Sequence, residues 1–322
     1  MNILFIIDRI EFKYFEFNNL VTNFWLIREF IRNNNDVFIT TIDNLSLISA
    51  KAYAKCFYTS EINGDIIFDE NSKKYAIEDF QLVMFRPDPP VDSDYINATY
   101  IFDFVDRNKT LLINDPHAIR NFNEKMHTTM FSDLMPENIV TASKSDIIEF
   151  LNIHGEIVLK PLNACFGSGV MTLKKGDKNT AVIIDLMTKK QSQSIMVQKY
   201  IQAAKYGDKR VLFLGKNVLD VCIQKLPSGN DFKFNEHCDA NIIKAELSAE
   251  EKEKFPPVAQ KLEAIGLPLA GLDVIDGKII EINVTSPCYF IKEINQHHGI
   301  ELEKEITKFI LNCCSFMLSG SY

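Results

Sequence analysis

The sequence GLDVIDGKIIEINV, residues 271–284, consists of two β-type runs joined by Asp276-Gly277. An Asp-Gly pair between two apolar runs is a strong signal for a β-hairpin. Side chains alternate between the two faces of a strand, so Glu281 and Asn283, two residues apart, face the same side. Asp273 is on the partner strand and could lie opposite them. The stretch therefore predicts an antiparallel hairpin with three polar side chains on one face.

These three side chains form a candidate metal site. Two carboxylates and an amide oxygen are hard oxygen ligands, which suit Mg²⁺ held between protein and phosphate groups. The alternative is a solvated polar face on an exposed hairpin. The flanking residues are strongly apolar, and a buried acidic cluster is costly without a cation. We therefore expect Asp273, Glu281 and Asn283 to bind Mg²⁺, with Mn²⁺ as an alternative ion.

Two lysines and a loop of small residues are candidate phosphate ligands. Lys125 falls at a predicted helix start, and Lys160 ends the apolar run Ile157–Leu159. Either lysine could instead lie at the surface, with its stem along apolar neighbours. The loop 163–169 follows Lys160, and its backbone N–H groups could approach a polyphosphate closely. No G-x-x-x-x-G-K-[ST] motif occurs, so this is not a Walker loop. The small residues that close the loop are Gly167, Ser168 and Gly169.

Two arginines occupy places suited to anionic groups. Arg210 follows Asp208 and Lys209 into a predicted strand and could stabilise charge on a transferring phosphoryl group. A charged loop rim is the alternative reading for this group. Arg86 follows the apolar run Val83–Phe85, at the strand end where open α/β sheets bind ligands. A guanidinium there suits a carboxylate.

Composition limits the class of protein. The length of 322 residues predicts two or three subdomains. Apolar residues make up 46% and charged residues 24%, which is typical of a globular protein with a full core. The net charge of −8 argues against a nucleic-acid binder, which needs a basic face. No apolar run reaches the length of a membrane span.

The seven cysteines are scattered and odd in number, with no C-x-x-C pair, so neither a disulfide framework nor a zinc site is indicated. The opening apolar run ends at Asp8 and Arg9, too early for a signal peptide. We therefore expect a cytoplasmic protein. Cys313-Cys314 is expected on the apolar face of a terminal helix, and His297-His298 in a loop or at the surface.

The first third of the chain alternates strand and helix patterns, which predicts a parallel sheet. The expected strands are 2–8, 36–42, 82–85 and 111–114, and the expected helices are 17–32 and 94–106.

The pattern changes at Asn123, where a small α+β unit is expected. Its predicted helices are 124–131, 145–152 and 181–188, and its strands are 156–160, 170–174 and 195–199. The last segment has a polar stretch at 227–244. Its predicted strands are 210–214, 218–224, 270–275 and 278–283, followed or interrupted by helices at 249–265 and at the C-terminus.

Taken together, these segments resemble bacterial glutathione synthetase nearly end to end. The order and spacing of the matching stretches agree with that family, and the last stretch is highly specific to it. The matching stretches are Arg86 with 88–90, then 94–100, 123–125, 159–162, 207–211, 271–274 and 281–287.

The resemblance implies an ATP-grasp fold of mixed α/β and α+β structure, with an N-terminal doubly wound parallel-sheet domain at 1–122. A central subdomain would span 123–200, and a C-terminal subdomain with a lid loop at about 226–242 would span 201–322. ATP would lie between the last two. The implied reaction joins γ-glutamylcysteine to glycine through an acyl phosphate and yields glutathione, ADP and phosphate. The family is commonly tetrameric, so a homo-oligomer is expected.

The resemblance also implies roles for single residues. Lys125, Lys160 and the 167–169 loop would contact the ATP phosphates, and Asp208 would approach the ribose. Arg210 would stabilise the reacting centre, together with Lys225. The residues along the adenine would be Gln198, Lys199, Tyr200 and Ile201. The metal ligands would be Asp273, Glu281 and Asn283, and the peptide-substrate contacts would be Arg86, Asn283 and Ser286.

Departures from the family pattern gather around the substrate. The lid is usually rich in Gly and Arg, whereas residues 232–241 read FKFNEHCDAN. Lys225 and Lys233 stand where the family usually has Arg, which loses the fork geometry that clamps carboxylates. Pro87 replaces a customary Lys, and Phe166 enters a loop of small residues. These departures leave two alternatives to glutathione synthesis: a related ligase with another peptide or amine, and a nucleotide-binding relative without catalytic activity.

Overall fold

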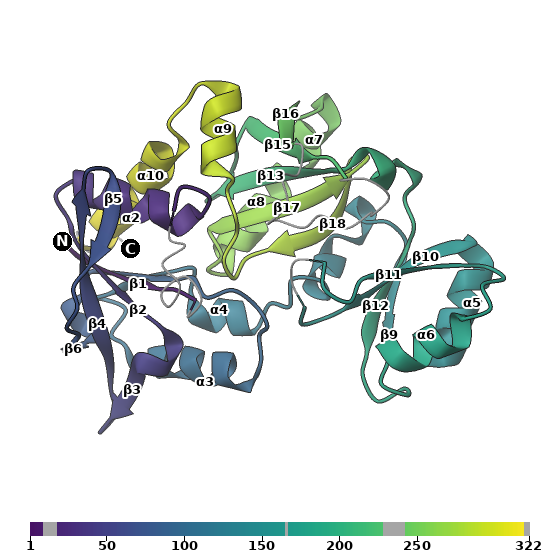
Figure 1. The fold of residues 1–322 in the computed structure, drawn as a ribbon, viewed down its shortest axis with the longest axis horizontal. Coiled ribbons are helices and arrows are strands. Elements are labelled where there is room, and N and C mark those ends of the chain that lie inside the picture. Colours follow the sequence, from purple (N-terminus) through teal and green to yellow (C-terminus); the bar gives the residue numbers. More distant parts are fainter. Residues whose placement is uncertain (9–17, 165–166, 228–241, 319–322) are drawn as a thin grey trace.

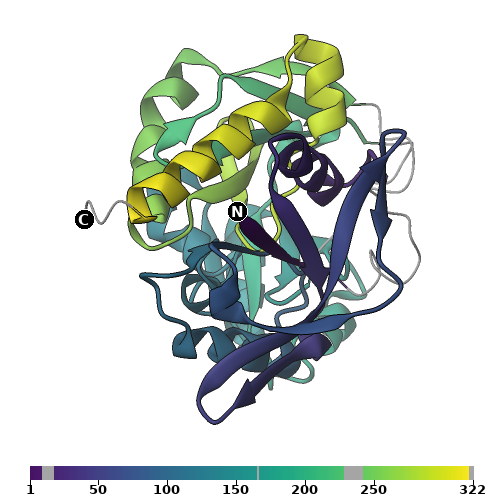
Figure 2. The ribbon, with the colours of Figure 1, turned by 90° about the vertical axis from the view of Figure 1, so that its left-hand side faces the viewer.

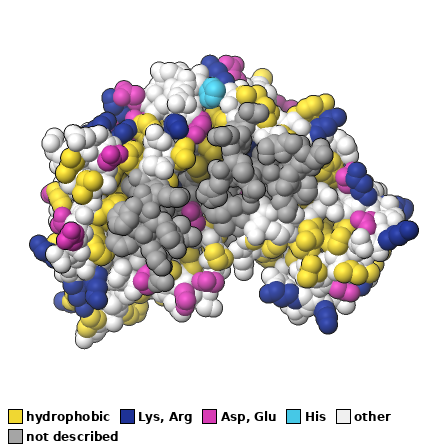
Figure 3. Space-filling view, viewed as in Figure 1, with side chains coloured by type: hydrophobic (Ala, Val, Ile, Leu, Met, Phe, Trp, Pro, Cys, Tyr) yellow, Lys and Arg dark blue, Asp and Glu magenta, His cyan; other side chains and the backbone are white. Residues whose placement is uncertain are grey.

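The computed structural model describes residues 1–8, 18–164, 167–227 and 242–318, which form three β-sheets with flanking helices (Figure 1). The N-terminus and the last helix, which ends at residue 318, lie in or beside the N-terminal part, while the central sheet lies at the far end of the molecule. On the face in Figure 3, basic side chains lie among acidic ones around the outline, the ordinary pattern of a charged protein surface.

The N-terminal sheet has a parallel core in the order β2-β1-β7-β8. Its strands are β1 (Asn2–Ile6), β2 (Asp36–Thr40), β7 (Leu82–Phe85) and β8 (Leu111–Ile113), and all are largely buried. Helix α2 (Thr22–Arg32) connects β1 to β2 and buries the face that carries Phe24, Ile27 and Phe30. The predicted parallel sheet is therefore confirmed.

Four antiparallel strands extend this sheet and were not predicted. They are β3 (Leu45–Ile48), β4 (Lys51–Ile62), β5 (Asp65–Phe68) and β6 (Lys73–Ala76). β4 pairs with β2 and carries the other three. The first half of β4 buries only small side chains, namely Ala52, Ala54 and Cys56. Their low hydrophobicity hides the alternation from sequence inspection.

Two short helices lie between β7 and the central part. The single helix expected at 94–106 is α3 (Ser93–Ile101) followed by a 3₁₀ turn, Phe102–Phe104. Asp92 caps α3 by accepting hydrogen bonds from the backbone N–H groups of Asp94 and Tyr95. Helix α4 (Pro116–Arg120) follows β8 and has Asp115 as its cap.

The central sheet is antiparallel, in the order β11-β10-β12-β9. Its strands are β9 (Asn138–Thr141), β10 (Glu156–Pro161), β11 (Met171–Lys174) and β12 (Ile195–Lys199). Two helices, α5 (Lys144–His154) and α6 (Thr180–Met187), cover one face, and their shared core is a separate apolar cluster. The α-helix expected at 124–131 is wrong, because this stretch is turn followed by a 3₁₀ segment, His127–Leu134.

The C-terminal sheet is also antiparallel, in the order β16-β15-β13-β17-β18, with β14 on β13. Its strands are β13 (Asp208–Leu214), β14 (Asn217–Val218), β15 (Val221–Lys225), β16 (Ile242–Glu246), β17 (Leu269–Ile275) and β18 (Lys278–Asn283). β16 begins inside the polar stretch expected at 227–244, since Ile242 already pairs with Lys225.

Four helices complete the C-terminal part. The helix expected at 249–265 is divided into α7 (Ala249–Lys254) and α8 (Pro256–Ala264), because Pro256 cannot continue the hydrogen bonding of α7. The last two are α9 (Ile291–His298) and α10 (Leu302–Leu318), and α10 packs on α2 (Figure 2). This contact ties the end of the chain to its beginning.

Two smaller expectations concern the last two helices. Cys314 is fully buried and Cys313 partly buried on α10, as expected. His297-His298 closes α9 and is not in a loop, but His297 is exposed, so the expected surface position is confirmed for that residue. His298 Nε2 lies 2.8 Å from the Cys222 carbonyl oxygen. All five cysteines in the described ranges are free thiols. Within these ranges, no helix has the length and apolar character needed to span a bilayer.

Candidate active site

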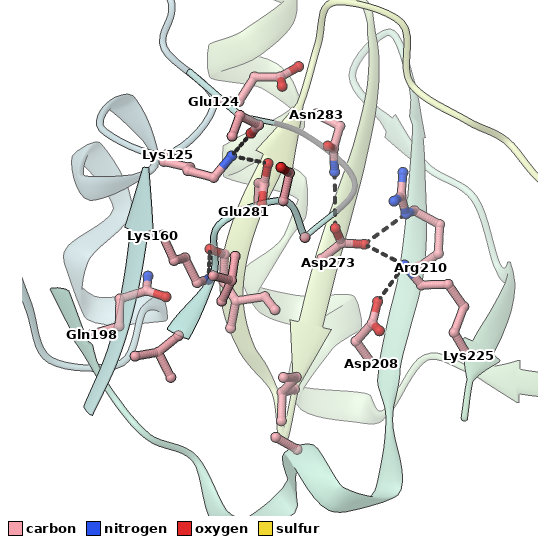
Figure 4. A pocket seen from close by; sticks show the side chains of 18 of the residues that line it. Glu124, Lys125, Lys160, Gln198, Asp208, Arg210, Lys225, Asp273, Glu281 and Asn283 are labelled. Atoms are coloured by element: carbon pink, nitrogen blue, oxygen red, sulfur yellow. Dashed lines mark hydrogen bonds and ion pairs between the residues drawn. The ribbon is translucent and has the colours of Figure 1, made fainter. Parts of the chain in front are cut away.

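A cavity lies between the central sheet and the C-terminal sheet, and strands of both sheets line it (Figure 4). The hairpin β17–β18 forms one wall. Asp273 pairs with Glu281 and Gly271 with Asn283, so the predicted hairpin and its polar face are confirmed. Asn283 Nδ2 donates a hydrogen bond to Asp273 Oδ2 at 3.2 Å. All three predicted metal ligands line the cavity.

A buried network of two cations and two carboxylates occupies one end of the cavity. Arg210 Nε lies 2.8 Å from Asp273 Oδ1, and Lys225 Nζ lies 2.9 Å from Asp208 Oδ2 and 3.6 Å from Asp273 Oδ1. The four side chains come from β13, β15 and β17, which are adjacent in the sheet. Positive and negative groups alternate in this network, so each cation has a carboxylate within ion-pair distance.

The network perturbs its two carboxylates in opposite directions. Burial acts to raise the pKa of Asp273, but the Arg210 and Lys225 cations outweigh it, so this pKa lies well below its ordinary value. Burial raises the pKa of Asp208 to about 6, against the attraction of Lys225. Burial also acts to lower the pKa of Lys225, yet the two carboxylates hold it above its ordinary value. Lys225 and Asp273 are therefore charged in the ligand-free protein at neutral pH.

Two buried lysines face the hairpin from the central side. Lys125 Nζ lies 2.9 Å from Glu281 Oε1 and donates a hydrogen bond to the Ala164 carbonyl oxygen at 2.6 Å. Lys160 Nζ donates to the Ile280 carbonyl oxygen at 3.2 Å. Burial lowers the pKa of Lys160 to about 8, although the Glu281 carboxylate opposes that shift. Neither lysine is a surface residue, so the alternative reading for both is excluded.

The strand β12 and the residues after it provide a different kind of wall. Gln198 is 2% exposed, and its Nε2 has no hydrogen-bond partner in the described part of the chain. A buried polar atom without a partner is costly, so it marks a place for a polar ligand. Lys199, Tyr200 and Ile201 also line the cavity. The apolar side chains of this region are Val158, Ile275 and Ile280. A flat heterocycle with polar edges fits this surface.

Gly167 and Ser168 line the cavity, and Gly169 does not. Gly169 has φ +71°, and a Cβ there would stand 2.9 Å from Pro161 Cγ. Its role in the structure is therefore to let the loop turn closely over β10. Residues 165–166 of this loop lie outside the described ranges, as do residues 228–241 of the predicted lid.

Ser286 lines the cavity, while Arg86 lies behind the segment that carries it. Arg86 is 2% exposed, and its Nη2 donates to the Pro287 carbonyl oxygen at 3.0 Å and contacts Ser286 Oγ at 3.4 Å. Its Nε donates to Asn23 Oδ1. The guanidinium is thus directed at the first turn of α2 and at residues 286–287 after β18, and it reaches the cavity wall only through Ser286.

Several lining residues were not among the sequence candidates. Glu124 is the most informative, because it is a buried carboxylate next to Lys125. The stretch Asn123-Glu124-Lys125 matches the family pattern, but only its lysine has a charge suited to phosphate. The other lining residues missed include Asp88, Thr285 and Cys288, which follow strand ends and carry no local signal of their own.

The donor set fits a nucleotide and a divalent cation. Asp273, Glu281 and Asn283 provide hard oxygen ligands, and Lys125 and Lys160 provide buried cations on the opposite side. Two antiparallel sheets with a lysine-lined cavity between them are the architecture of the ATP-grasp class of proteins.

Comparisons with known proteins support this class and specify the family. Residues 1–120 match the family model "Prokaryotic glutathione synthetase, N-terminal domain", and residues 124–299 match its ATP-grasp domain. The chain belongs to the prokaryotic glutathione synthetase family. It is 35% identical over 287 residues to the glutathione synthetase of Nostoc sp., covering 86% of this chain and 88% of that one. It is 33% identical to the Salmonella typhimurium glutathione synthetase, covering 87% and 90%.

Solved structures share the fold. A D-cycloserine synthetase has a TM-score of 0.69 at 12% identity, covering 98% of this chain and 100% of that one. A Chryseobacterium gregarium RiPP-associated ATP-grasp ligase has a TM-score of 0.64 at 17% identity, covering 97% of each chain. These matches confirm the predicted ATP-grasp fold.

Proposed function

We propose that the chain joins γ-glutamylcysteine to glycine at the expense of ATP, through an acyl phosphate, to give glutathione, ADP and phosphate. The observation that carries this proposal is the pairing, across one cavity, of two buried lysines with the polar face of the β17–β18 hairpin. Family membership then selects this ligation among the reactions that such a cavity supports.

The nucleotide would lie along β10 and β12, with its base near Gln198, Lys199, Tyr200 and Ile201. Lys125, Lys160 and the backbone at Gly167 and Ser168 would bind its phosphates, and Gly169 would contribute by shaping the loop. When bound, ATP supplies the phosphoryl group that activates the cysteinyl carboxylate, and Mg²⁺ or Mn²⁺ neutralises the phosphate charge. The metal would be held by Asp273, Glu281 and Asn283, which are already held close together by the hairpin register.

The chain's own residues would orient the reacting groups. Lys125 now contacts Glu281, so a cation and a metal ligand meet at the place where phosphate charge would develop. Arg210 lies 3.0 Å from where a Cβ on Gly271 would be, which places its guanidinium tightly against β17. From there it would stabilise negative charge on the reacting carboxyl centre, with Lys225 beside it. Ser286, Asn283 and Arg86 remain the predicted peptide contacts, Arg86 acting from behind residues 286–287.

Asp208, which is predicted to approach the ribose, lines the cavity and is paired with Lys225. We propose that this pair opens when nucleotide binds, which frees Asp208 for the ribose hydroxyls. The raised pKa of Asp208, about 6, reflects how poorly burial suits its charge. A hydroxyl donor there would favour the ionised form.

We further propose the division of the chain at 1–122, 123–200 and 201–322, a cytoplasmic location and a homo-oligomer, with a tetramer as the expected form. The free thiols of the described cysteines fit a reducing compartment. The oligomer rests on the family resemblance.

The altered lid sequence favours one alternative, a ligase with a different amine or peptide. Glutathione synthesis and this alternative are distinguished by ADP release from the purified protein with ATP, Mg²⁺ and γ-glutamylcysteine, measured with and without glycine. Release that depends on glycine supports glutathione synthesis. Bound ATP with no glycine-dependent release would overturn it and point to another acceptor.

A further inference from the structure

Glu124 is a buried carboxylate at the junction between the N-terminal part and the cavity. Its Oε1 accepts three hydrogen bonds: from the backbone N–H of Val284 at 2.6 Å, from the backbone N–H of Thr285 at 2.9 Å, and from Thr285 Oγ1 at 3.0 Å. One oxygen atom therefore binds two consecutive backbone amides and a hydroxyl. Burial and the nearby Glu281 carboxylate raise the pKa of Glu124, while the hydrogen bonds from Thr285 and Val284 act to lower it.

The backbone of Glu124 also contacts β18. Its carbonyl oxygen accepts from the backbone N–H of Ile282 at 3.2 Å and from Thr128 Oγ1 at 2.6 Å. Residue 124 thus contacts Ile282, which precedes Asn283, and Val284 and Thr285, which follow it. Its neighbour Lys125 contacts Glu281. The two adjacent residues therefore contact the chain from Glu281, in β18, to Thr285, just after β18.

We propose that Glu124 is a positioning residue for the ligation, an inference that rests on the function proposed above. Its carboxylate fixes the end of β18, so that Glu281 and Asn283 keep their register as metal ligands and Ser286 keeps its place at the cavity. The six-residue segment that carries all three, residues 281–286, runs past the end of β18, where pairing to β17 stops at Asn283. Beyond that point, the backbone N–H groups of Val284 and Thr285 depend on Glu124.

Two substitutions separate positioning from general stability. Glu124→Met keeps the volume and removes the acceptor, whereas Glu124→Gln keeps one acceptor oxygen. The matched control is Glu251→Met. Glu251 is 3% exposed and also binds a backbone amide and a lysine, at 2.8 Å from Ser248 N and 2.7 Å from Lys209 Nζ, but does not line the cavity.

The experiment measures Mn²⁺ affinity by electron paramagnetic resonance in the presence of ADP, together with melting temperature and glycine-dependent ADP release. Glu124→Met should weaken Mn²⁺ binding and lower kcat by about 10- to 100-fold, as outer contacts of metal ligands typically do. Glu124→Gln should recover most of both. Glu251→Met should lower the melting temperature comparably while leaving Mn²⁺ affinity within about twofold of wild type.

Equal Mn²⁺ affinity in Glu124→Met and wild type would overturn the proposal, and so would equal loss in Glu124→Met and Glu251→Met. If Glu124→Met fails to fold, Thr285→Val removes only the hydroxyl donor. That variant should weaken Mn²⁺ binding about three- to tenfold, and an unchanged affinity would overturn the inference. If wild type binds Mn²⁺ and ADP but shows no glycine-dependent turnover, the proposed function fails while the Mn²⁺ comparison still tests Glu124.

Discussion

Burial disfavours the charged form of Lys160. Replacing this lysine should therefore stabilise the protein when no nucleotide is bound. Its pKa falls from 10.5 to about 8 through burial. A shift of this size, about 2.5 units, corresponds to about 3 kcal/mol at about 1.36 kcal/mol per unit. Lys160→Met removes that cost but also removes the hydrogen bond to the Ile280 carbonyl oxygen, worth about 1 kcal/mol.

The net expectation at pH 7 is a gain of about 2 kcal/mol, or a melting temperature higher by about 5 °C. The folded-state pKa lies below the unfolded value, so between these two values the unfolded chain holds a proton that the folded protein has lost. Wild-type stability therefore rises relative to Lys160→Met as the pH increases from about 8 to 10.5. The advantage of the variant should shrink over that range.

Thermal unfolding of both proteins without nucleotide, from pH 7 to pH 10, measures this directly. ATP affinity measured in parallel should fall by more than about tenfold in Lys160→Met, because a phosphate ligand is lost. A variant that melts below wild type at pH 7, or a stability difference that does not depend on pH, would refute the reasoning.

Three further substitutions test separate parts of the site. Glu281→Gln should reduce Mg²⁺-dependent turnover by about 100-fold with an unchanged circular dichroism spectrum, and wild-type turnover would remove Glu281 from the metal site. Gln198→Met should raise KM for ATP about tenfold with kcat preserved, since Nε2 is expected to bind the base; a change confined to kcat would contradict that placement. Lys225→Arg should lower KM for γ-glutamylcysteine severalfold if the peptide carboxylate lies near position 225, and an unchanged KM would exclude that position.

Much of the fold follows from local pattern. The strands at 82–85, 195–199 and 278–283 were predicted at their observed bounds, because each is a short apolar run with clear stops. The strand β4 was missed because the buried positions of its first half are alanine and cysteine, beside exposed Lys51 and Lys55. The helix expected at 124–131 does not form, because Glu124 and Lys125 contact β18 and the residues that follow it instead of helical neighbours.

The site was predictable where one residue type suggests one ligand. Carboxylates in a hairpin and lysines after apolar runs have that property, and these side chains do meet across the cavity. The residue types of Glu124 and of the Asp208–Lys225 ion pair do not by themselves suggest a partner. Their contacts join residues 160 and 17 positions apart, and nothing local in the sequence fixes the partner. Arg86 shows the same limit, since its strand-end position was right but its side chain contacts protein groups.

The central claim is ligation through an activated cysteinyl carboxylate, and the most direct test follows its oxygen atoms. γ-Glutamylcysteine labelled with ¹⁸O in the cysteinyl carboxylate is incubated with the protein, ATP, Mg²⁺ and glycine, and the products are analysed by mass spectrometry. The account predicts glutathione together with inorganic phosphate that carries one ¹⁸O atom for each molecule formed. Unlabelled phosphate, or ADP formed without glutathione, would contradict it.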